Sequence, residues 1–282
     1  MGGLYALLGM AIVLVCKATQ VVSLAHGQLL FFGAYFVWLF YNGLGLPIWI
    51  ALPIGMALTG VMGMVIDRLT MRPLIGQPIA SLFLMTLALF MALDGICKLI
   101  LKGYSKTYTP PFIATEPMYL ATLMIPPSAL WGFGVALLIA VLLGLFFRYT
   151  NMGLAMRITA EDHLVAQSMG IKVKRVFSSV WFISAMVTCI AGVFMVFNTD
   201  IFYTMPEIGF KGMIVALFGG LESLAGALLG GLVLGLLEGL TAGYIEPLVG
   251  GGMREVAAYG FLLLILLIRP YGLFGLVRIE RV

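Results

Sequence analysis

The sequence predicts an all-α, polytopic membrane protein with about eight or nine transmembrane or half-spanning helices, and three observations predict it. Of its 282 residues, 62% are hydrophobic and only 10% are charged. A soluble domain averages about 25% charged residues, so these charges are too few to cover a water-facing surface. The apolar residues fall into runs near the length of about 20 that crosses a bilayer as a helix. The charged residues gather in a few segments between those runs.

Nine apolar segments are predicted to cross the membrane fully or in part. The first has no positively charged segment before it and no clean cleavage site after it, so we expect a span and not a removable signal peptide. The seventh is too short to cross alone, and Gly219-Gly220-Leu221-Glu222-Ser223 joins it to the eighth. We expect broken helices there, because irregular backbone at membrane depth survives only where protein or a water-filled path satisfies it. The nine segments are residues 3–21, 26–42, 46–66, 78–101, 130–148, 176–197, 210–220, 224–241 and 253–269.

Two longer loops separate these segments, and residues 1–282 form a single predicted transmembrane domain. The outer loop, at about 102–129, contains Pro110-Pro111 and Pro126-Pro127 among Tyr and Thr residues, a composition that excludes a span. The inner loop, at about 149–175, is polar and patterned.

Basic residues predict the orientation of the chain. Most of the sixteen Lys and Arg residues lie in the loops around 67–77, 148–175 and 269–282. Because cytoplasmic loops carry an excess of Lys and Arg, we expect these loops inside and the N-terminus outside. Nine crossings then place the C-terminus in the cytoplasm.

The inner loop contains a predicted amphipathic helix over residues 153–170. Four apolar residues fall at near-helical spacing with polar residues between them, namely Leu154, Ile158, Val165 and Met169. Gly170 is placed as a helix stop, and basic residues follow it. Two interpretations are open: a connector that lies on the lipid headgroups, or a peg that fits a groove on a partner protein.

Five polar or charged residues lie at predicted membrane depth, where an unpaired charge costs about 2.5–3.5 kcal/mol on insertion scales. They are Lys17, His26, Asp94, Glu222 and Glu238. His26 lies at a predicted helix break, where it either lines a gate or bonds carbonyl groups that the break frees. The same two interpretations apply to Glu222. Lys17 either pairs with Asp94, or faces the path of a transported molecule and meets its carboxylate.

Small residues indicate how the helices meet. The eighth segment contains glycines at about four-residue spacing, which lets two helix backbones approach closely. They are Gly226, Gly230, Gly231, Gly235 and Gly239. This face packs either within the chain or against a partner subunit along the translocation path. In addition, Ser23-Leu24-Ala25 and Ser223-Leu224-Ala225 each precede an outward segment, as in transporters built from two related halves.

The sequence shows no catalytic or metal-binding machinery, so we expect neither an enzyme nor a cofactor in this chain. The nucleotide-binding pattern GxxxxGK[ST] is absent. Neither His26 nor His163 has a second His, Cys or acid at metal-ligand spacing. Cys16, Cys97 and Cys189 lie far apart within apolar runs, which favours buried thiols over disulfides. The net charge of +4 is explained by topology, so we expect no nucleic-acid partner.

Short motifs recur in order along most of the chain. They are Gly3-Leu4-Tyr5-Ala6-Leu7, Ser23-Leu24-Ala25-His26-Gly27-Gln28, Gly33-Ala34-Tyr35, Ala216-Leu217-Phe218-Gly219-Gly220-Leu221-Glu222-Ser223 and Arg269-Pro270-Tyr271-Gly272-Leu273-Phe274-Gly275. The ordered set resembles the LivH-type permease of the branched-chain amino acid ABC transporter family. The inner loop resembles the EAA loop of ABC-importer permeases, which inserts a helix into a cleft on the ATPase subunit.

This resemblance implies a permease subunit of an ABC importer for branched-chain amino acids or related small amphipathic molecules, in a bacterial or archaeal cytoplasmic membrane. The implied partners are a second, LivM-type permease, two ATPase subunits that use the ATP, and an external substrate-binding protein. The residues at the matching places of the coupling loop are Arg157, Ala160, Glu161, Asp162 and Gly170. The candidates for the translocation path or gate are Lys17, Ser23, His26, Gly27, Gly219, Gly220 and Glu222.

The chain also departs from the family pattern, and other functions stay open. Ser23 and Leu24 stand where the family usually has Asn and an aromatic residue, which leaves the substrate open among branched-chain amino acids, urea, short amides and aromatic acids. One alternative is a secondary transporter driven by an ion gradient, with Lys17, Asp94 and Glu238 as coupling residues. Another is a membrane-embedded enzyme, although no His/Asp/Glu cluster lies on one span.

Overall fold

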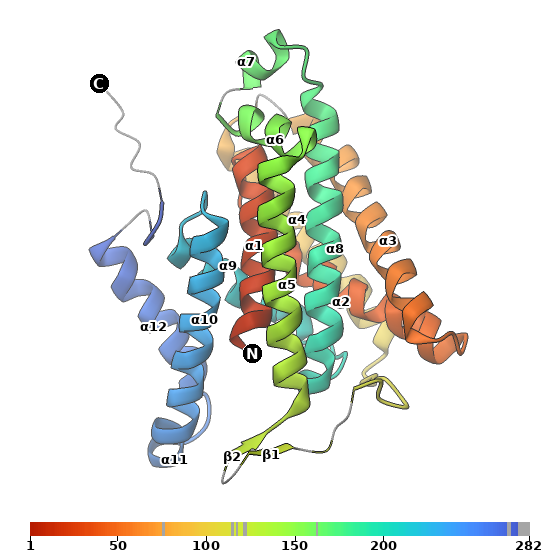
Figure 1. Cartoon of the computed structure of the whole chain (residues 1–282), viewed down its shortest axis with the longest axis vertical. Helices are drawn as coiled ribbons and strands as arrows, with labels where there is room; N and C mark the ends of the chain where they lie inside the picture. Colours follow the sequence, from red (N-terminus) through yellow and green to blue (C-terminus); the bar gives the residue numbers. More distant parts are fainter. Residues whose placement is uncertain are drawn as a thin grey trace.

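The computed structural model describes residues 1–74, 77–113, 116, 118–120, 123–161, 163–269 and 272–275. Within these residues, six helices are long and apolar enough to cross a membrane (Figure 1). They are α1 (Gly2–Thr19), α3 (Ile48–Ile66) continued by η2 (Asp67–Met71) and η3 (Arg72–Leu74), α4 (Ile79–Leu101), α5 (Pro127–Tyr149), α8 (Val173–Thr199), and α10 (Leu224–Leu240) continued by η5 (Thr241–Ile245) and α11 (Glu246–Val249).

Three further helices are shorter than a membrane span. They are α2 (His26–Trp38), which η1 (Leu39–Gly43) continues, α9 (Ile208–Gly219), which η4 (Met205–Glu207) precedes, and α12 (Met253–Ile268). All nine predicted apolar segments therefore form helices, with ends within a few residues of the prediction. Six of them have the length of a span.

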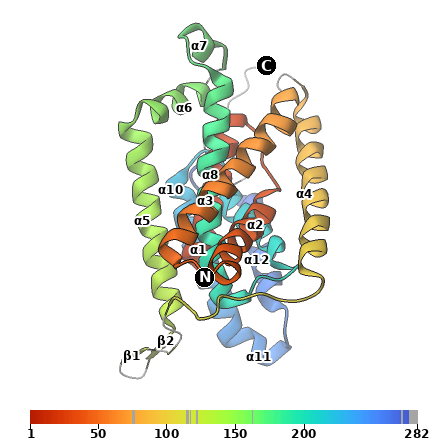
Figure 2. The same ribbon diagram turned by 90° about the vertical axis from the view of Figure 1, so that its right-hand side faces the viewer.

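Helices α1 and α8 form the core of the bundle. In α1, 83% of the apolar span is buried inside the protein, against 22% in α4 and 17% in α5. Figure 2 shows α4 and α5 on opposite sides of the bundle. Since lipid is as apolar as a leucine side chain, close packing rather than the hydrophobic effect has to hold such helices together.

Glycines bring α10 into backbone contact with its neighbours in the chain. A Cβ on Gly231 would lie 2.4 Å from Cα of Ala6, and one on Gly235 would lie 2.3 Å from Cα of Gly2, so α10 packs directly on α1. Gly226 and Gly230 pack against α9 in the same way. The glycine face is thus used within the chain, and these four positions do not meet a partner subunit as the alternative interpretation required.

The outer loop lies on the end of α2 and adds the antiparallel strands β1 (Met118–Leu120) and β2 (Leu123–Ile125). The phenol of Tyr108 donates a hydrogen bond to the carbonyl of Ala34 at 3.0 Å, and Nε1 of Trp38 donates to the carbonyl of Thr107 at 2.9 Å. Burial raises the pKa of Tyr108 well above its ordinary value, so the phenol remains a donor. The end of the bundle with β1 and β2 is called the hairpin end below.

The opposite end, called the α6 end, contains the inner loop as two helices, α6 (Asn151–Glu161) and α7 (His163–Ser168). The helix predicted over 153–170 is confirmed as helical at residues 153–161 and 163–168, and Asp162 between them lies outside the described residues. Gly170 has a φ of 79°, a left-handed conformation that stops α7 as predicted. A Cβ on Gly153 would lie 2.6 Å from the carbonyl oxygen of Phe146, so α6 lies tightly across the end of α5.

Candidate translocation and coupling site

A cavity of about 720 Å³ opens at the α6 end, where the end of α1, the end of α6 and the break between α9 and α10 meet. Its lining residues are Cys16, Lys17, Gln20, Arg157, Ala160, Glu161, Leu221, Glu222, Ser223 and Phe274. Members of the predicted coupling set and of the predicted path set therefore line the same cavity. The lining members of the two sets are at least 61 residues apart in the sequence, which did not predict that they meet.

Local sequence explains why the helix breaks beside this cavity. Helix α9 ends at Gly219, and Gly220 takes a φ of 98°, which only glycine adopts without strain. Ser223 then starts α10, because its Oγ accepts a hydrogen bond from the backbone N–H of Gly226 at 3.0 Å.

The carbonyl groups at the end of α9 are satisfied by a distant segment. The backbone N–H of Leu273 donates to the carbonyl of Phe218 at 2.9 Å, and that of Phe274 donates to the carbonyl of Gly219 at 3.2 Å. Residues 272–275 therefore close the break from the far end of the sequence. The motif around Gly272 was noted in the sequence, but its role as the cap of α9 was not predicted.

Four charged side chains face the cavity: Lys17, Arg157, Glu161 and Glu222. Among the described residues, none of the four forms an ion pair with another residue. Two cations and two carboxylates thus lie around one open volume without an ion pair to any other described residue. Such a cavity accepts a molecule that carries both a positive and a negative group, or a polar surface of a partner protein.

The predicted ion pair between Lys17 and Asp94 is wrong. Asp94 instead pairs with Lys98, one turn further along α4, with 2.6 Å between Oδ2 and Nζ. Lys17 lies at the α6 end of α1, whereas Asp94 lies in the half of α4 that leads to the hairpin end. The hydropathy of the two segments predicts that both residues lie in the membrane. It does not predict whether they lie at the same depth.

In the second break, over residues 20–25, Val21, Ser23 and Ala25 are buried, whereas Gln20 is exposed and lines the cavity. His26 at the start of α2 is completely buried, and its Nε2 lies 2.7 Å from Oγ of Ser184. The hydroxyl of Ser184 donates to the carbonyl of Ala11 at 2.8 Å, and Nδ1 of His26 lies 3.4 Å from the carbonyl oxygen of Ser23. The ring of Trp181 stacks on the imidazole at 5.8 Å.

The two other gate candidates at this break are buried as well. A Cβ on Gly27 would lie 2.0 Å from the carbonyl oxygen of Pro206, which brings the start of α2 into backbone contact with the start of α9. The Oγ of Ser23 accepts a hydrogen bond from the backbone N–H of Ala25 at 3.3 Å. Neither residue, nor His26, lines the 720 Å³ cavity.

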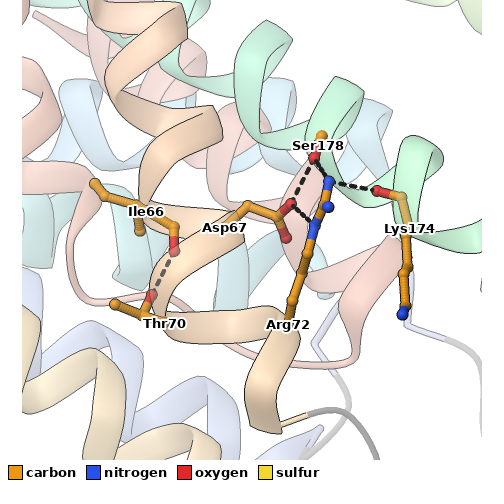
Figure 3. Close-up of polar contacts among 6 residues, drawn as sticks. All are labelled: Ile66, Asp67, Thr70, Arg72, Lys174 and Ser178. Atoms are coloured by element: carbon orange, nitrogen blue, oxygen red, sulfur yellow. Dashed lines mark hydrogen bonds and ion pairs between the residues drawn. The ribbon is translucent and has the colours of Figure 1, made fainter.

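A polar cluster that the sequence did not reveal joins α3 to α8 (Figure 3). Asp67 is fully buried, and its Oδ2 accepts a hydrogen bond from the hydroxyl of Ser178 at 2.6 Å. The same oxygen forms an ion pair with Arg72, whose Nε lies 3.0 Å away. Nη2 of Arg72 also donates to Ser178 and to the carbonyl of Lys174, the latter at 3.0 Å. The carboxylate in this position was not among the intramembrane candidates.

A second unpredicted pair lies between α9 and α10. Nζ of Lys211 and Oε1 of Glu238 are 2.6 Å apart, and Lys211 also lies 3.4 Å from the phenol oxygen of Tyr5. Glu238 is buried, and its predicted cost at membrane depth is therefore offset by Lys211.

The α6–α7 segment presents one face to the protein and one outward. Ile158 packs with Ile171 against a small apolar cluster of Ala166, Val173 and Phe177. Leu154 and Met169, which were predicted on the same apolar face, are exposed. The outward face thus offers apolar side chains at the end of the bundle that also contains the cavity.

Comparisons with known proteins agree with these features. Residues 1–269 match the family described as branched-chain amino acid transport system, permease component. The chain is 26% identical to the high-affinity branched-chain amino acid transport system permease protein LivH of Salmonella typhimurium, over all of this chain and 94% of that protein. It is 27% identical to the corresponding permease BraD of Pseudomonas aeruginosa, with the same coverage.

A more distant relative has another named substrate. The fructose import permease protein FruF of Bifidobacterium longum is 28% identical over 69% of this chain and 55% of that protein. No solved structure matches the chain significantly.

The fold and the site define a polytopic helical transport protein, with broken helices inside the bundle and a charged cavity at one end. The chain belongs to the family of permease components of branched-chain amino acid transport systems. It is a permease subunit of an ABC importer, and hence a transport subunit and not an enzyme.

Proposed function

We propose that the chain forms one half of the membrane channel through which branched-chain amino acids, or related small amphipathic molecules, enter the cell. The match to the family over residues 1–269 carries this proposal, and LivH and BraD are similar along the full chain. The partial similarity to a fructose permease is the reason for keeping related molecules in the proposal.

In the proposed topology, the six long helices cross the membrane and α2, α9 and α12 cross it fully or in part, which gives eight or nine crossings. The α6 end faces the cytoplasm, because most basic residues of the connecting segments lie there. Those described are Arg68, Arg72, Arg148, Arg157, Lys172, Lys174, Arg175 and Arg269. The N-terminus is then outside and the C-terminus inside, in the cytoplasmic membrane of a bacterium or archaeon.

The proposed partners are a second, LivM-type permease, two ATPase subunits and an external substrate-binding protein. The α6–α7 segment, with Arg157, Ala160, Glu161, Asp162 and Gly170, is the proposed contact with an ATPase. Its outward apolar side chains, Leu154 and Met169, support this assignment, because buried apolar anchors dominate the energy of protein interfaces.

The 720 Å³ cavity is the proposed inner mouth of the translocation path. Lys17 and Glu222 lie on its wall, where they are able to meet the carboxylate and the ammonium group of an amino acid. The cavity also lies against the end of α6, through Arg157, Ala160 and Glu161. A displacement of α6 therefore changes the shape of this cavity, through which the substrate leaves the proposed path. Gly219 and Gly220 form the hinge on the other side, and Ser23, His26 and Gly27 are proposed as the packed gate above it.

The rival function, ion-driven secondary transport, gains no support from its two proposed coupling carboxylates. Asp94 is paired with Lys98, and Glu238 is paired with Lys211. A carboxylate that binds a coupling ion must give up such a partner in every cycle.

Reconstitution separates these functions. The assembled complex in proteoliposomes is expected to accumulate labelled leucine only when ATP and the binding protein are both present. The purified chain alone, under a proton or sodium gradient, is expected to accumulate none. Accumulation by the chain alone under an ion gradient would contradict the proposal.

A further inference from the structure

The cluster of Asp67, Arg72 and Ser178 joins the end of α3 to the first turns of α8, the helix that follows α7 in the chain (Figure 3). We infer that this cluster is a positioning device for transport. It fixes the first turns of α8 to the end of α3. A movement of α6–α7 is then transmitted through α8 to α3 and does not end at the connection between α7 and α8. This inference rests on the proposed function, because it takes α6–α7 as the element that the ATPase moves.

The first step is the joint between α7 and α8. Helix α7 ends at Ser168 and α8 begins at Val173. Between them, the backbone N–H of Ile171 donates to the carbonyl of Ala166 at 3.0 Å, and Ala166, Val173 and Phe177 form an apolar cluster. The hydrogen bond and the apolar cluster therefore hold the end of α7 against the first turns of α8. A displacement of α7 then moves the start of α8 with it.

The second step is the link from α8 to α3. Asp67 follows α3 directly, is completely buried, and has one cation, Arg72, as its partner. Ser178 of α8 donates to the same carboxylate oxygen, and Arg72 reaches back to the carbonyl of Lys174 on α8. Sliding α8 along α3 at this level would keep the Asp67–Arg72 pair, which lies within one segment, but would break the bond from Ser178 to the buried carboxylate and the bonds from Arg72 to α8, which is unfavourable. The two helices are thus fixed in one register here.

The third step is the route from this cluster to the buried break before α2. Within two turns beyond Ser178, Trp181 and Ser184 of α8 both contact His26. The same stretch of α8 packs on α3, since a Cβ on Gly63 would lie 2.7 Å from the carbonyl oxygen of Trp181. Residues 174–184 of α8 therefore contact the Asp67 cluster at one end and the proposed gate at the other.

A purely stabilising role accounts poorly for this cluster. The α3–α8 contact is already close and apolar at Gly60 and Gly63. Replacing a buried ion pair by apolar side chains is often neutral or stabilising, so the Asp67–Arg72 pair contributes little net stability. The bonds from Ser178 to Asp67 and from Arg72 to the carbonyl of Lys174 cross between the two helices and specify one register. A fixed register is what transmission of movement between two helices requires.

The test uses the full assembled transporter in proteoliposomes and measures leucine uptake per ATP hydrolysed. The variants are Asp67→Asn, Ser178→Ala and the double substitution, and the matched control is Asp94→Asn, which breaks an ion pair on α4 near the hairpin end. Asp67→Asn and Ser178→Ala are each expected to assemble and to hydrolyse ATP at near wild-type rates, while uptake per ATP falls on the order of fivefold or more. The double variant is expected to fall no further than the worse single variant, because both act through one carboxylate. The control is expected to keep the wild-type ratio.

Two results would overturn the inference. One is an unchanged uptake per ATP in Ser178→Ala, a variant that keeps the Asp67–Arg72 pair and with it the fold. The other is a parallel loss of ATP hydrolysis and uptake with lowered thermal stability in both single variants, which is the signature of a structural role only. If instead the wild-type complex shows no ATP-driven uptake, the proposed function fails, and that outcome is recognised before any variant is compared.

Discussion

The two helix breaks carry the same three residues, Ser-Leu-Ala, but have opposite surroundings. In the break at 20–25, Ser23 accepts from Ala25, and the adjoining His26 is fully buried and bonded to Ser184. In the break at 220–223, Ser223 accepts from Gly226, but the neighbouring Glu222 faces a cavity of about 720 Å³. The same three residues restart the two helices differently, because Ser223 caps α10 directly, whereas α2 begins three residues after Ser23 and has no side-chain cap. Packing by other helices determines whether each break is buried or lines a cavity. The following predictions sharpen this comparison, from the largest expected change in stability to the smallest.

The largest effect is expected from Gly27→Ala at the buried break. The new Cβ would lie 2.0 Å from a backbone oxygen of Pro206, so α2 and α9 must separate. Overpacking of this kind lowers the free energy of unfolding by about 1–3 kcal/mol or more. Thermal unfolding in detergent measures the loss, with Gly239→Ala as the control, because that position has open space and alanine favours the helix. Equal stability of the two variants would show that the start of α2 is not packed as described.

A smaller loss is expected from Ser184→Ala, which removes the partner of His26. It leaves two buried groups without their hydrogen bond, Nε2 of the imidazole and the carbonyl of Ala11, at a cost of about 1–3 kcal/mol. At the other break, Ser223→Ala removes a helix cap and costs about 1 kcal/mol. The same thermal measurement ranks the two, and a larger loss for Ser223→Ala would reverse the comparison.

The smallest change in stability is expected from Lys17→Met and Glu222→Gln on the cavity wall. Neither side chain has an ion-pair partner among the described residues, so stability shifts by no more than about 0.5 kcal/mol. Uptake of leucine by the assembled complex is expected to fall at least about tenfold, because a charged hydrogen bond to the substrate is lost. The exposed Lys102→Met at the hairpin end is the control. Unchanged transport of the native substrate in Lys17→Met removes Lys17 from the path.

Hydropathy alone was enough to place the helices, because run length and the bilayer thickness fix how many residues a span needs. The break at 219–223 was also predicted, since its glycines and its short preceding segment are local features. The side-chain pairs between helices could not be predicted in the same way. The ion pair of Lys17 with Asp94 is wrong, and the hydrogen bond between Asp67 and Ser178 was not predicted. Those two residues lie 111 positions apart, and their contact depends on the rotation and tilt of two helices, which length and composition do not determine.

The cavity illustrates the same limit. Its walls come from α1, α6 and the α9–α10 break, and residues 272–275 complete it by capping α9. The sequence contains a recognisable motif in each of these segments. Only the packing of α1 against α6 and the α9–α10 break shows that Lys17, Arg157 and Glu222 surround one volume.

The most direct test of the account concerns the outward face of α6–α7 as the docking surface for the ATPase. Leu154 and Met169 are exposed, so Leu154→Asp with Met169→Asp is expected to leave the fold of the permease intact. The measurement is co-purification of the ATPase subunits with this double variant, followed by ATP-driven leucine uptake, with the exposed Tyr104→Asp at the hairpin end as the control. The account predicts that the ATPases and the uptake are lost in the double variant and kept in the control. Full assembly and wild-type uptake in the double variant would contradict it.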